Sequence, residues 1–231
     1  MHDFSDAPFA KTQPPSAIGD AHRIPMQFDA WMTYEPGWLC ASEADALLDA
    51  ITAEADWGER PIIARGKEVM QPRLIDWAGD LPYKYSGQVL DPKPHSPKLD
   101  TLRKKIEAHV GQAFNHTLLN LYRDGKDSVA MHADNEPELG QFPIIASISL
   151  GATRVFRLQS RRDRKRRRRL VLEHGSLLVM GGAMQRTWRH AVPKDPEIAE
   201  PRLNITCRRL MGPPGWRDPR WKQNPKPSNG Q

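Results

Sequence analysis

Cysteine is nearly absent from this chain of 231 residues, in which only Cys40 and Cys207 occur. Two cysteines do not imply a disulfide framework, so the composition fits a reducing compartment such as the cytoplasm. The sequence also lacks any run of about 18 apolar residues, the length that a membrane-spanning helix needs. Its N-terminus has no apolar stretch typical of a secretory signal. We therefore expect a cytoplasmic protein without a membrane segment.

Acidic residues are outnumbered by basic ones. The chain has 34 Lys and Arg against 28 Asp and Glu, which gives a formal net charge of +6 and a sequence pI of about 9.4. This excess is compatible with a polyanionic partner such as nucleic acid. Internal repeats are absent, and the length suffices for one sizeable domain with its own core. We expect a monomer.

Composition divides the chain into three parts. Residues 1–25 are rich in Pro, Ala and polar residues without periodicity, and are expected to form a mobile arm. Residues 26–212 are expected to form a single domain. The last part, 213–231, carries Trp216 and Trp221 among several prolines and is too proline-rich for regular structure.

Two helices are predicted in the first half of the domain. One covers residues 42–56 with Ser42 as its N-cap, and the other opens at Ser96-Pro97, where a proline suits the first helical turn. Apolar residues at helical spacing predict that both helices cover a sheet. These residues are Leu47, Leu48, Ile51 and Ala55 in the first helix, and Leu99, Leu102, Ile106, Val110 and Phe114 in the second.

Short strands separated by glycine-rich turns dominate the second half of the chain. Such a succession predicts two sheets packed as a sandwich or barrel, and therefore a mainly β domain with flanking helices. The predicted strands cover 117–122, 144–150, 153–159, 169–173, 176–180, 187–192 and 202–210. Residues 61–74 additionally predict a hairpin that turns at Gly66.

His132, Asp134 and His190 carry the strongest chemical signal. Two histidines and one carboxylate are the ligands of a facial triad that binds non-haem Fe(II) and leaves coordination positions open. In an extended segment, residues i and i+2 project to the same side, so His132 and Asp134 can reach one metal while Ala133 points away. Taken alone, the pattern also fits a chance pair beside an ordinary half-buried histidine.

The segment from Arg202 to Arg208 alternates polar and apolar residues, as a strand does when only one of its faces is buried. Its polar face could simply meet water. However, a guanidinium group pairs bidentately with a carboxylate, so these two arginines also suit an anion with two carboxylates. Asn204 and Thr206, which lie between them, can add hydrogen bonds.

Asn120 and Tyr122 form a second polar pair, shortly before the predicted metal ligands. All these motifs occur in the order and spacing of the AlkB family of Fe(II)/2-oxoglutarate-dependent dioxygenases, and the chain resembles in particular the AlkB homologues that repair alkylated DNA. The resemblance covers about residues 70–210. It extends through Gln71-Pro72-Arg73, Leu81-Pro82-Tyr83-Lys84-Tyr85-Ser86, Asn120-Leu121-Tyr122-Arg123-Asp124-Gly125, Pro143-Ile144-Ile145-Ala146-Ser147, Gly151-Ala152-Thr153-Arg154 and Glu173-His174-Gly175-Ser176.

The resemblance implies a double-stranded β-helix, or jelly-roll, over about residues 115–212. It adds N-terminal helices and a nucleotide-recognition lid over about residues 60–90. The metal site would lie at the open mouth of the jelly-roll.

The resemblance also implies that His132, Asp134 and His190 bind Fe(II), with 2-oxoglutarate as cosubstrate and O2 as oxidant. Arg202 would pair with the distal carboxylate of 2-oxoglutarate. Arg208 would lie near the chelating end of the cosubstrate or near Asp134. The remaining cofactor-binding residues would be Asn120, Tyr122, Asn204 and Thr206.

The activity implied is oxidative demethylation of 1-methyladenine and 3-methylcytosine in DNA, with RNA as a further substrate. Formaldehyde is released as 2-oxoglutarate becomes succinate and CO2. The methyl group lies on the Watson–Crick edge, so the base must leave its stack. Aromatic side chains of the lid suit stacking on that base, although each could equally be a core residue. The expected substrate contacts are Arg73, Trp77, Tyr83, Tyr85, Asn135, Glu136 and Arg169.

Residues 161–169 contain eight basic residues in nine, between two predicted strands. A charge run is usually a solvated loop, but neutralising several phosphates also gives salt-sensitive affinity for nucleic acid. We favour a hairpin that grips phosphates, with Arg169 at the position of a substrate-contacting arginine of the family. His174, shortly afterwards, is interpreted as structural.

Two positions depart from the family pattern. Asn135 stands where the resembled relatives carry an aspartate near the target base, so the base preference is left open. Cys207 replaces an aromatic residue on the apolar face of its strand and is expected to change packing only.

Three functions are compatible with parts of this sequence. The basic run and the aromatic lid favour a nucleic-acid demethylase over a dioxygenase that acts on a protein side chain or a small metabolite. A non-enzymatic nucleic-acid-binding module is the third, and it would not need an intact triad. The sequence leaves open whether single or double strands, and DNA or RNA, are preferred.

Overall fold

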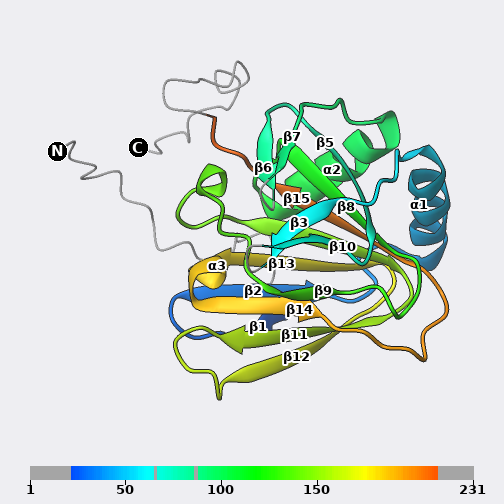
Figure 1. The fold of residues 1–231 in the computed structure, drawn as a ribbon. Coiled ribbons are helices and arrows are strands. Elements are labelled where there is room, and N and C mark those ends of the chain that lie inside the picture. The colour runs from blue at the N-terminus through cyan, green and yellow to red at the C-terminus, as the bar shows by residue number, and fades with distance from the viewer. Residues whose placement is uncertain (1–21, 65–66, 86–87, 213–231) are drawn as a thin grey trace, which may run out of the picture.

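The computed structural model describes residues 22–64, 67–85 and 88–212. Two antiparallel sheets pack face to face, as expected for a jelly-roll (Figure 1). The larger sheet has the order β1 (Arg23–Ile24), β2 (Ala30–Glu35), β13 (Ser176–Gly182), β10 (Ile145–Gly151), β15 (Arg202–Arg208), β8 (His116–Tyr122) and β5 (Leu74–Gly79). The smaller sheet has the order β12 (Arg167–Leu172), β11 (Arg154–Ser160), β14 (Trp188–Val192) and β9 (Val129–His132).

Hairpins and helices complete the described part. The hairpins are β3 (Pro61–Ala64) with β4 (Lys67–Met70), and β6 (Tyr83–Tyr85) with β7 (Gln88–Leu90). The helices are α1 (Ala41–Glu54), α2 (Pro97–Val110), α3 (Met184–Thr187) and a 3-10 turn at Pro137–Leu139. Within the described ranges, none of these helices combines the length and the apolar character needed to cross a membrane.

The N-terminal boundary of the domain lies earlier than predicted. Arg23 pairs with Thr33 and Ile24 with Met32, so these residues extend the larger sheet and the predicted arm cannot reach residue 25. The sequence does not predict β2, because it is buried on both faces and therefore lacks a polar and apolar alternation. The arm expected over residues 1–21 and the tail over 213–231 lie outside the described residues.

The core has two layers, one on each face of the larger sheet. Apolar residues of α1 and α2 pack on its outer face, against side chains that include Leu203, Ile205 and Cys207 of β15. Because side chains alternate along a strand, the polar residues of β15 face the smaller sheet. Burial raises the pKa of Cys207 to about 12, which agrees with the packing role predicted for it.

The first turns of the two long helices differ. Ser96 caps α2 as predicted, since its Oγ accepts a hydrogen bond of 3.2 Å from the backbone N–H of Leu99. The helix predicted over residues 42–56 is confirmed as α1, but its predicted N-cap is wrong, because Cys40 is the N-cap and Ser42 lies inside the helix. Cys40 has the extended backbone that an N-cap requires, but it makes no side-chain cap hydrogen bond.

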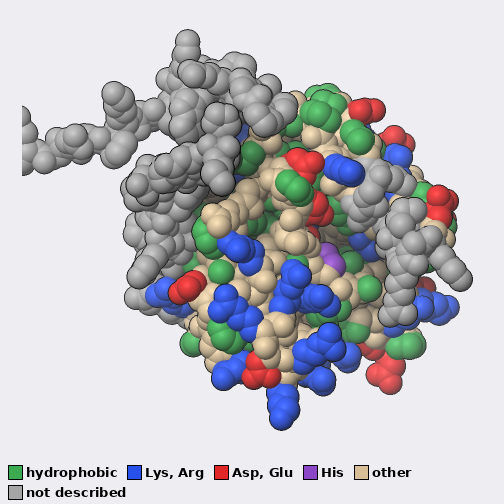
Figure 2. All heavy atoms as spheres, turned by 60° about the vertical axis from the view of Figure 1, so that its left-hand side comes forward, with side chains coloured by type: hydrophobic (Ala, Val, Ile, Leu, Met, Phe, Trp, Pro, Cys, Tyr) green, Lys and Arg blue, Asp and Glu red, His purple; other side chains and the backbone are tan. Residues whose placement is uncertain are grey.

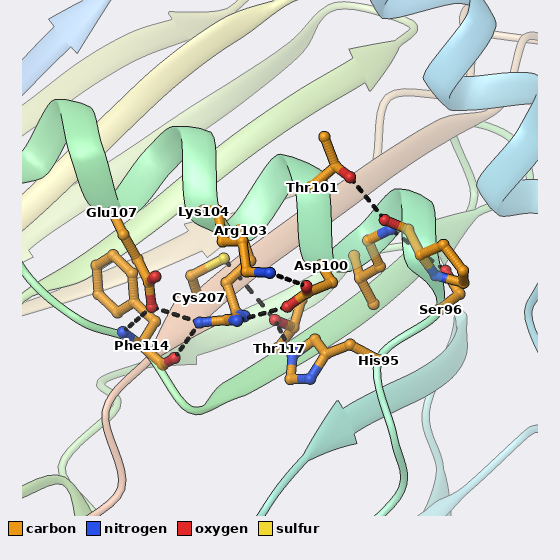
Figure 3. A network of polar contacts seen from close by, with 12 residues as sticks. His95, Ser96, Asp100, Thr101, Arg103, Lys104, Glu107, Phe114, Thr117 and Cys207 are labelled. Atoms are coloured by element: carbon orange, nitrogen blue, oxygen red, sulfur yellow. Dashed lines mark hydrogen bonds and ion pairs between the residues drawn. The ribbon is translucent and has the colours of Figure 1, made fainter. Parts of the chain in front are cut away.

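A charged network fixes α2 to the strand that follows it (Figure 3). Arg103 Nη1 donates to Glu107 Oε1 and to the carbonyl of Phe114, while its Nη2 donates to Asp100 Oδ1. Glu107 Oε1 also accepts from the backbone N–H of Phe114 at 2.6 Å. The end of α2 is thereby tied to the segment that enters β8.

The predicted lid over residues 60–90 is not one unit. The hairpin predicted over residues 61–74 is confirmed in part as β3–β4, although its turn residue Gly66 lies outside the described residues. Between the two hairpins, β5 pairs with β8 inside the larger sheet, for example Ile75 with Asn120. A strand bound to a sheet along its length cannot move as part of a lid, so only the two hairpins can serve as one.

Candidate active site

The three predicted metal ligands meet at one point. β9 ends at His132, and Asp134 follows two residues later. His190 lies on β14 directly opposite His132 in the antiparallel pairing. One ligand atom from each of the three side chains lies within 4.8 Å of the others. This is close enough for all three to bind a single ion.

Hydrogen bonding and burial prepare both histidines for metal binding. His132 Nδ1 lies 2.9 Å from the carbonyl of Ala130. Since a carbonyl can only accept, Nδ1 carries a proton, which leaves Nε2 as the nitrogen that can bind a metal. Burial lowers the pKa of His190 to about 3, so its ring is neutral at physiological pH. Neutral imidazole is the form that binds metals.

Asp134 is held as a charged carboxylate. Burial alone would raise its pKa, but the interactions with Arg208, His132 and His190 together outweigh burial and hold the pKa well below 3.8. Arg208 Nη2 lies 2.8 Å from Asp134 Oδ2, and both side chains are buried. This contact is one of the two positions that the sequence predicts for Arg208.

Gln185 also positions Asp134, since its Oε1 accepts a hydrogen bond of 3.0 Å from the backbone N–H of Asp134. The amino-acid sequence alone does not point to this residue. Gln185 belongs to α3, a helix of four residues whose place beside Asp134 depends on packing between distant segments. No local pattern could have identified it.

The polar face of β15 lies between two other strands that carry polar residues. In the pairing with β8, Arg202 is opposite Tyr122 and Asn204 is opposite Asn120. All four residues are predicted from the sequence to bind the cosubstrate, and the register brings them to neighbouring positions on one sheet.

Hydrogen bonds join this face into one continuous row. Arg202 Nη2 donates to Ser149 Oγ at 2.9 Å and to Asn204 Oδ1 at 2.8 Å. Ser147 Oγ donates to Asn204 Oδ1 at 2.9 Å, and Asn204 Nδ2 donates to Thr206 Oγ1 at 2.6 Å. The two serines belong to β10 and are not predicted, because only the register with β15 brings them into the row.

Two buried guanidinium groups in this region have donors without acceptors. Within the described residues, Nε and Nη1 of both Arg202 and Arg208 are buried and have no hydrogen-bond partner. Burial lowers the pKa of Arg202. An unsatisfied buried donor costs about 1–3 kcal/mol, and more if it is charged. The donors therefore fit a bound anion that accepts hydrogen bonds from both arginines.

A pocket lies between the two sheets. Its wall contains all three predicted metal ligands. It also contains every residue predicted to bind the cosubstrate, namely Asn120, Tyr122, Arg202, Asn204, Thr206 and Arg208. Apolar side chains complete the wall, including Phe156, Leu172, Leu178, Met180 and Val192.

Arg73 and Tyr85 are the two predicted substrate contacts that also line this pocket. Arg73 is 4% exposed, and its Nε donates to Asn120 Oδ1 at 2.7 Å. Its Nη2 donates to the hydroxyl of Tyr85 at 3.0 Å. Arg73 therefore links the second hairpin to the polar row, a connection that the sequence does not predict.

Tyr83 and Trp77 do not line the pocket. Tyr83 is fully buried, with its ring centre 4.8 Å from that of His116. Trp77 lies on β5, where its Nε1 donates to the carbonyl of Asp91 at 2.7 Å and the guanidinium of Arg60 lies over its ring. Their stacking on a nucleobase stays a prediction.

The other predicted substrate contacts lie at the edges of the site. Asn135 and Glu136 directly follow Asp134, and burial together with the charge of Asp134 raises the pKa of Glu136. Arg169 is exposed on β12, outside the pocket wall. His174 is structural as interpreted, because its Nδ1 accepts a hydrogen bond of 2.8 Å from the backbone N–H of Gly151.

Comparison with known proteins agrees with this geometry. Residues 31–208 match the family described as the 2OG-Fe(II) oxygenase superfamily. The human protein named alpha-ketoglutarate-dependent dioxygenase alkB homolog 3 is 38% identical, with 92% of this chain and 82% of the human protein covered. The chain belongs to the AlkB family of 2OG-Fe(II) oxygenases.

A second relative and a solved structure are also similar to this chain. The bovine DNA oxidative demethylase ALKBH2 is 37% identical, with 74% of this chain and 66% of the relative covered. A solved structure, described as the structure of OsALKBH1, superposes with a TM-score of 0.56 at 17% identity, covering 77% of this chain and 97% of that chain. At that identity the likeness supports the jelly-roll fold alone.

Membership of the AlkB family makes the protein an Fe(II)- and 2-oxoglutarate-dependent dioxygenase that uses O2. The hypothesis that this protein is a non-enzymatic nucleic-acid-binding module is therefore wrong. The donor set agrees with the family, since two imidazoles beside a charged carboxylate suit a divalent iron.

Proposed function

We propose that this AlkB dioxygenase removes methyl groups from 1-methyladenine and 3-methylcytosine in DNA, and also in RNA. The observation that carries the proposal is the pocket in which the metal triad and two incompletely paired arginines meet. The names of the relatives, which include a DNA oxidative demethylase, support nucleic acid as the substrate class. The protein is proposed to act as a cytoplasmic monomer, in keeping with its low cysteine content.

His132, Asp134 and His190 are proposed to hold Fe(II), and Arg202 and Arg208 to pair with 2-oxoglutarate. Asn120, Tyr122, Asn204 and Thr206 would supply the remaining hydrogen bonds to the cosubstrate. When bound, Fe(II) with 2-oxoglutarate and O2 supplies the oxidation of the N-methyl carbon, with succinate and CO2 as coproducts. The hydroxymethylated base then loses formaldehyde.

The residues of this chain position the reactants. Arg208 helps to keep Asp134 charged, and the hydrogen bond of His132 Nδ1 to Ala130 leaves Nε2 to bind the metal. The apolar wall of the pocket keeps water away from the reacting centre. The target base would be turned out of its stack and would enter between the hairpins and the loop that carries Asn135 and Glu136.

The basic run extends this proposal to the nucleic-acid backbone. Residues 161–166 form the turn between β11 and β12, and all but Asp163 are exposed basic residues. Asp163 is used inside the turn, where Oδ2 pairs with Arg166 Nε at 3.2 Å. The other cations of the turn are proposed to hold phosphates of the substrate.

A demethylation assay tests the proposal. The protein is incubated with Fe(II), ascorbate, 2-oxoglutarate and an oligonucleotide that contains one 1-methyladenine or 3-methylcytosine. We expect each oligonucleotide to lose the mass of one CH2 group, with release of formaldehyde. The variants His132→Ala and Asp134→Ala should abolish the reaction. His109→Gln, which removes a histidine of α2 outside the site, should not.

The assay also separates the alternative function. A dioxygenase that acts on a protein side chain or a small metabolite would release succinate slowly while both oligonucleotides keep their mass. That outcome would overturn the proposed substrate and leave the family assignment intact.

A further inference from the structure

The outer face of the smaller sheet differs from its inner face in the exposure and charge of its side chains. Along β11, Phe156 and Leu158 are buried against the core, whereas Arg157 between them is exposed. The four strands of this sheet contain no Asp or Glu at all. The outer face is therefore built without any acidic residue of its own strands.

Four exposed arginines share this outer face. Arg157 on β11 is directly opposite Arg169 on β12. In the next row, Gln159 lies between Arg167 of β12 and Arg189 of β14. We call Arg157, Arg167, Arg169 and Arg189 the arginine face. In the part of the chain that the structure describes, none of the four forms a salt bridge.

Two adjoining hollows run along the arginine face, and Arg157 and Arg169 line both of them. One hollow adds Lys194 from the loop after β14, and the other adds Gln159 and Met131. Asp195 is the one carboxylate among the residues that line them. A cluster of like charges with so little compensation repels itself unless an anion binds to it.

The arginine face is close to the metal site. His132 and His190 lie on β9 and β14, two strands of the same sheet, with their side chains on the inner side. Met131, which lines the outer hollow, directly precedes His132. In Figure 2, most Lys and Arg side chains in view gather below the hollow in which a histidine is visible. A nucleic-acid strand that leaves the pocket over the edge strand β9 would reach the arginine face.

We propose that the arginine face is a second nucleic-acid surface, which holds phosphates of the substrate strand beyond the target base. This inference rests on the proposed function. Guanidinium groups bind phosphate bidentately, and those of Arg167 and Arg169 start from Cα atoms roughly 6.6 Å apart along one strand. A backbone with regularly repeated charges satisfies such a row, and Gln159 can donate to a phosphate or to a base.

Salt-dependent binding tests the arginine face directly. The full chain is titrated with unmethylated single-stranded oligonucleotides of about 5 and about 16 nucleotides, lengths near the two ends of the range of site sizes in single-strand-binding folds. Each phosphate contact adds about 0.7 to the slope of log K against log salt. For the double variant Arg157→Gln/Arg169→Gln we expect the slope to fall by about 1.4 with the long oligonucleotide, and much less with the short one.

Matched variants test whether a fall in the slope comes from the arginine face or from a loss of positive charge elsewhere. Arg157→Lys/Arg169→Lys keeps both charges and should keep most of the slope. Lys98→Gln/Lys104→Gln removes two charges from α2, on the outer side of the larger sheet, and should leave the slope unchanged. An unchanged slope in the first variant, or an equal fall in the α2 variant, would overturn the proposal. Stronger loss of binding to vesicles of anionic lipid than to oligonucleotides would also overturn it.

Demethylation measured on the same proteins separates this inference from the proposed function. If no methylated oligonucleotide is demethylated but the slope falls as expected, the arginine face stands and the proposed activity fails. If demethylation proceeds and the slope is the same in all variants, the activity stands and the arginine face fails.

Discussion

At the scale of single residues, Arg202 combines full burial with incomplete hydrogen bonding. Its Nη2 is occupied by Ser149 and Asn204, while Nε and Nη1 are without partners among the described residues. A buried guanidinium with unused donors can bind a carboxylate oxygen while it keeps its bonds to Ser149 and Asn204, whereas an ammonium group cannot reproduce that planar arrangement.

Replacing Arg202 with lysine should therefore weaken 2-oxoglutarate binding. We expect the KM for 2-oxoglutarate to rise about 10- to 100-fold, which corresponds to about 1.4–2.8 kcal/mol, while the KM for the oligonucleotide stays constant. Succinate release at varied 2-oxoglutarate measures this. Arg123→Lys, an exposed arginine paired with Asp127 outside the pocket, is the matched control. Equal increases in both KM values would contradict the assigned role.

At the scale of elements, α2 is held by charged side chains at its first and last turns. Hydrogen bonds from Lys104 and Arg103 outweigh the effect of burial and lower the pKa of Asp100 from 3.8 to about 2 (Figure 3). A carboxylate whose pKa is lower in the folded state stabilises the fold while it is ionised.

The variant Asp100→Asn should be less stable than the parent protein in a pH-dependent way. The stabilisation by Asp100 is fully present well above pH 3.8 and is lost as the pH falls toward about 2. Because Asp100 is partly exposed and screened by solvent, we expect a deficit of about 1 kcal/mol at neutral pH. Urea unfolding from neutral pH down to about 3 should show this deficit shrinking. A deficit independent of pH would show that the carboxylate charge is not its cause.

At the scale of the whole molecule, the site joins both sheets. The metal ligands come from β9, β14 and the segment after β9, in or beside the smaller sheet, whereas the cosubstrate residues come from β8 and β15 of the larger one. A cosubstrate that binds both groups would link the two sheets, and the unfolded chain offers no such site. Its binding energy therefore adds to the stability of the fold.

Adding Fe(II) and 2-oxoglutarate without oxygen should raise the unfolding temperature. A ligand at a hundredfold excess over its Kd stabilises the folded state by about 2.7 kcal/mol. Differential scanning calorimetry should show the increase, and a chelator should reverse it. Asp134→Ala should show little increase, because it lacks one metal ligand. An equal increase in that variant would mean that the metal binds elsewhere.

Local sequence patterns predict the chemistry of the site and the type of several elements, although not those of β2 and β9. The alternation over Arg202–Arg208 predicts a strand with one polar face, and the spacing of His132 and Asp134 predicts ligands on one side. The helix at Ser96 was equally predictable, because proline and capping signals act within one turn. These features depend on residues that are close in sequence.

Strand pairing and packing determine which distant residues become neighbours. Strand register brings Ser147 and Ser149 into the site, and the packing of α3 brings Gln185 there. Neither register nor helix packing can be recognised from a local sequence pattern. The same holds for the arginine face, since Arg189 joins Arg167 only across β11. A strand pattern fixes which face a side chain takes, but not which strand lies beside it. That pairing is set by the burial of apolar surface over the whole chain.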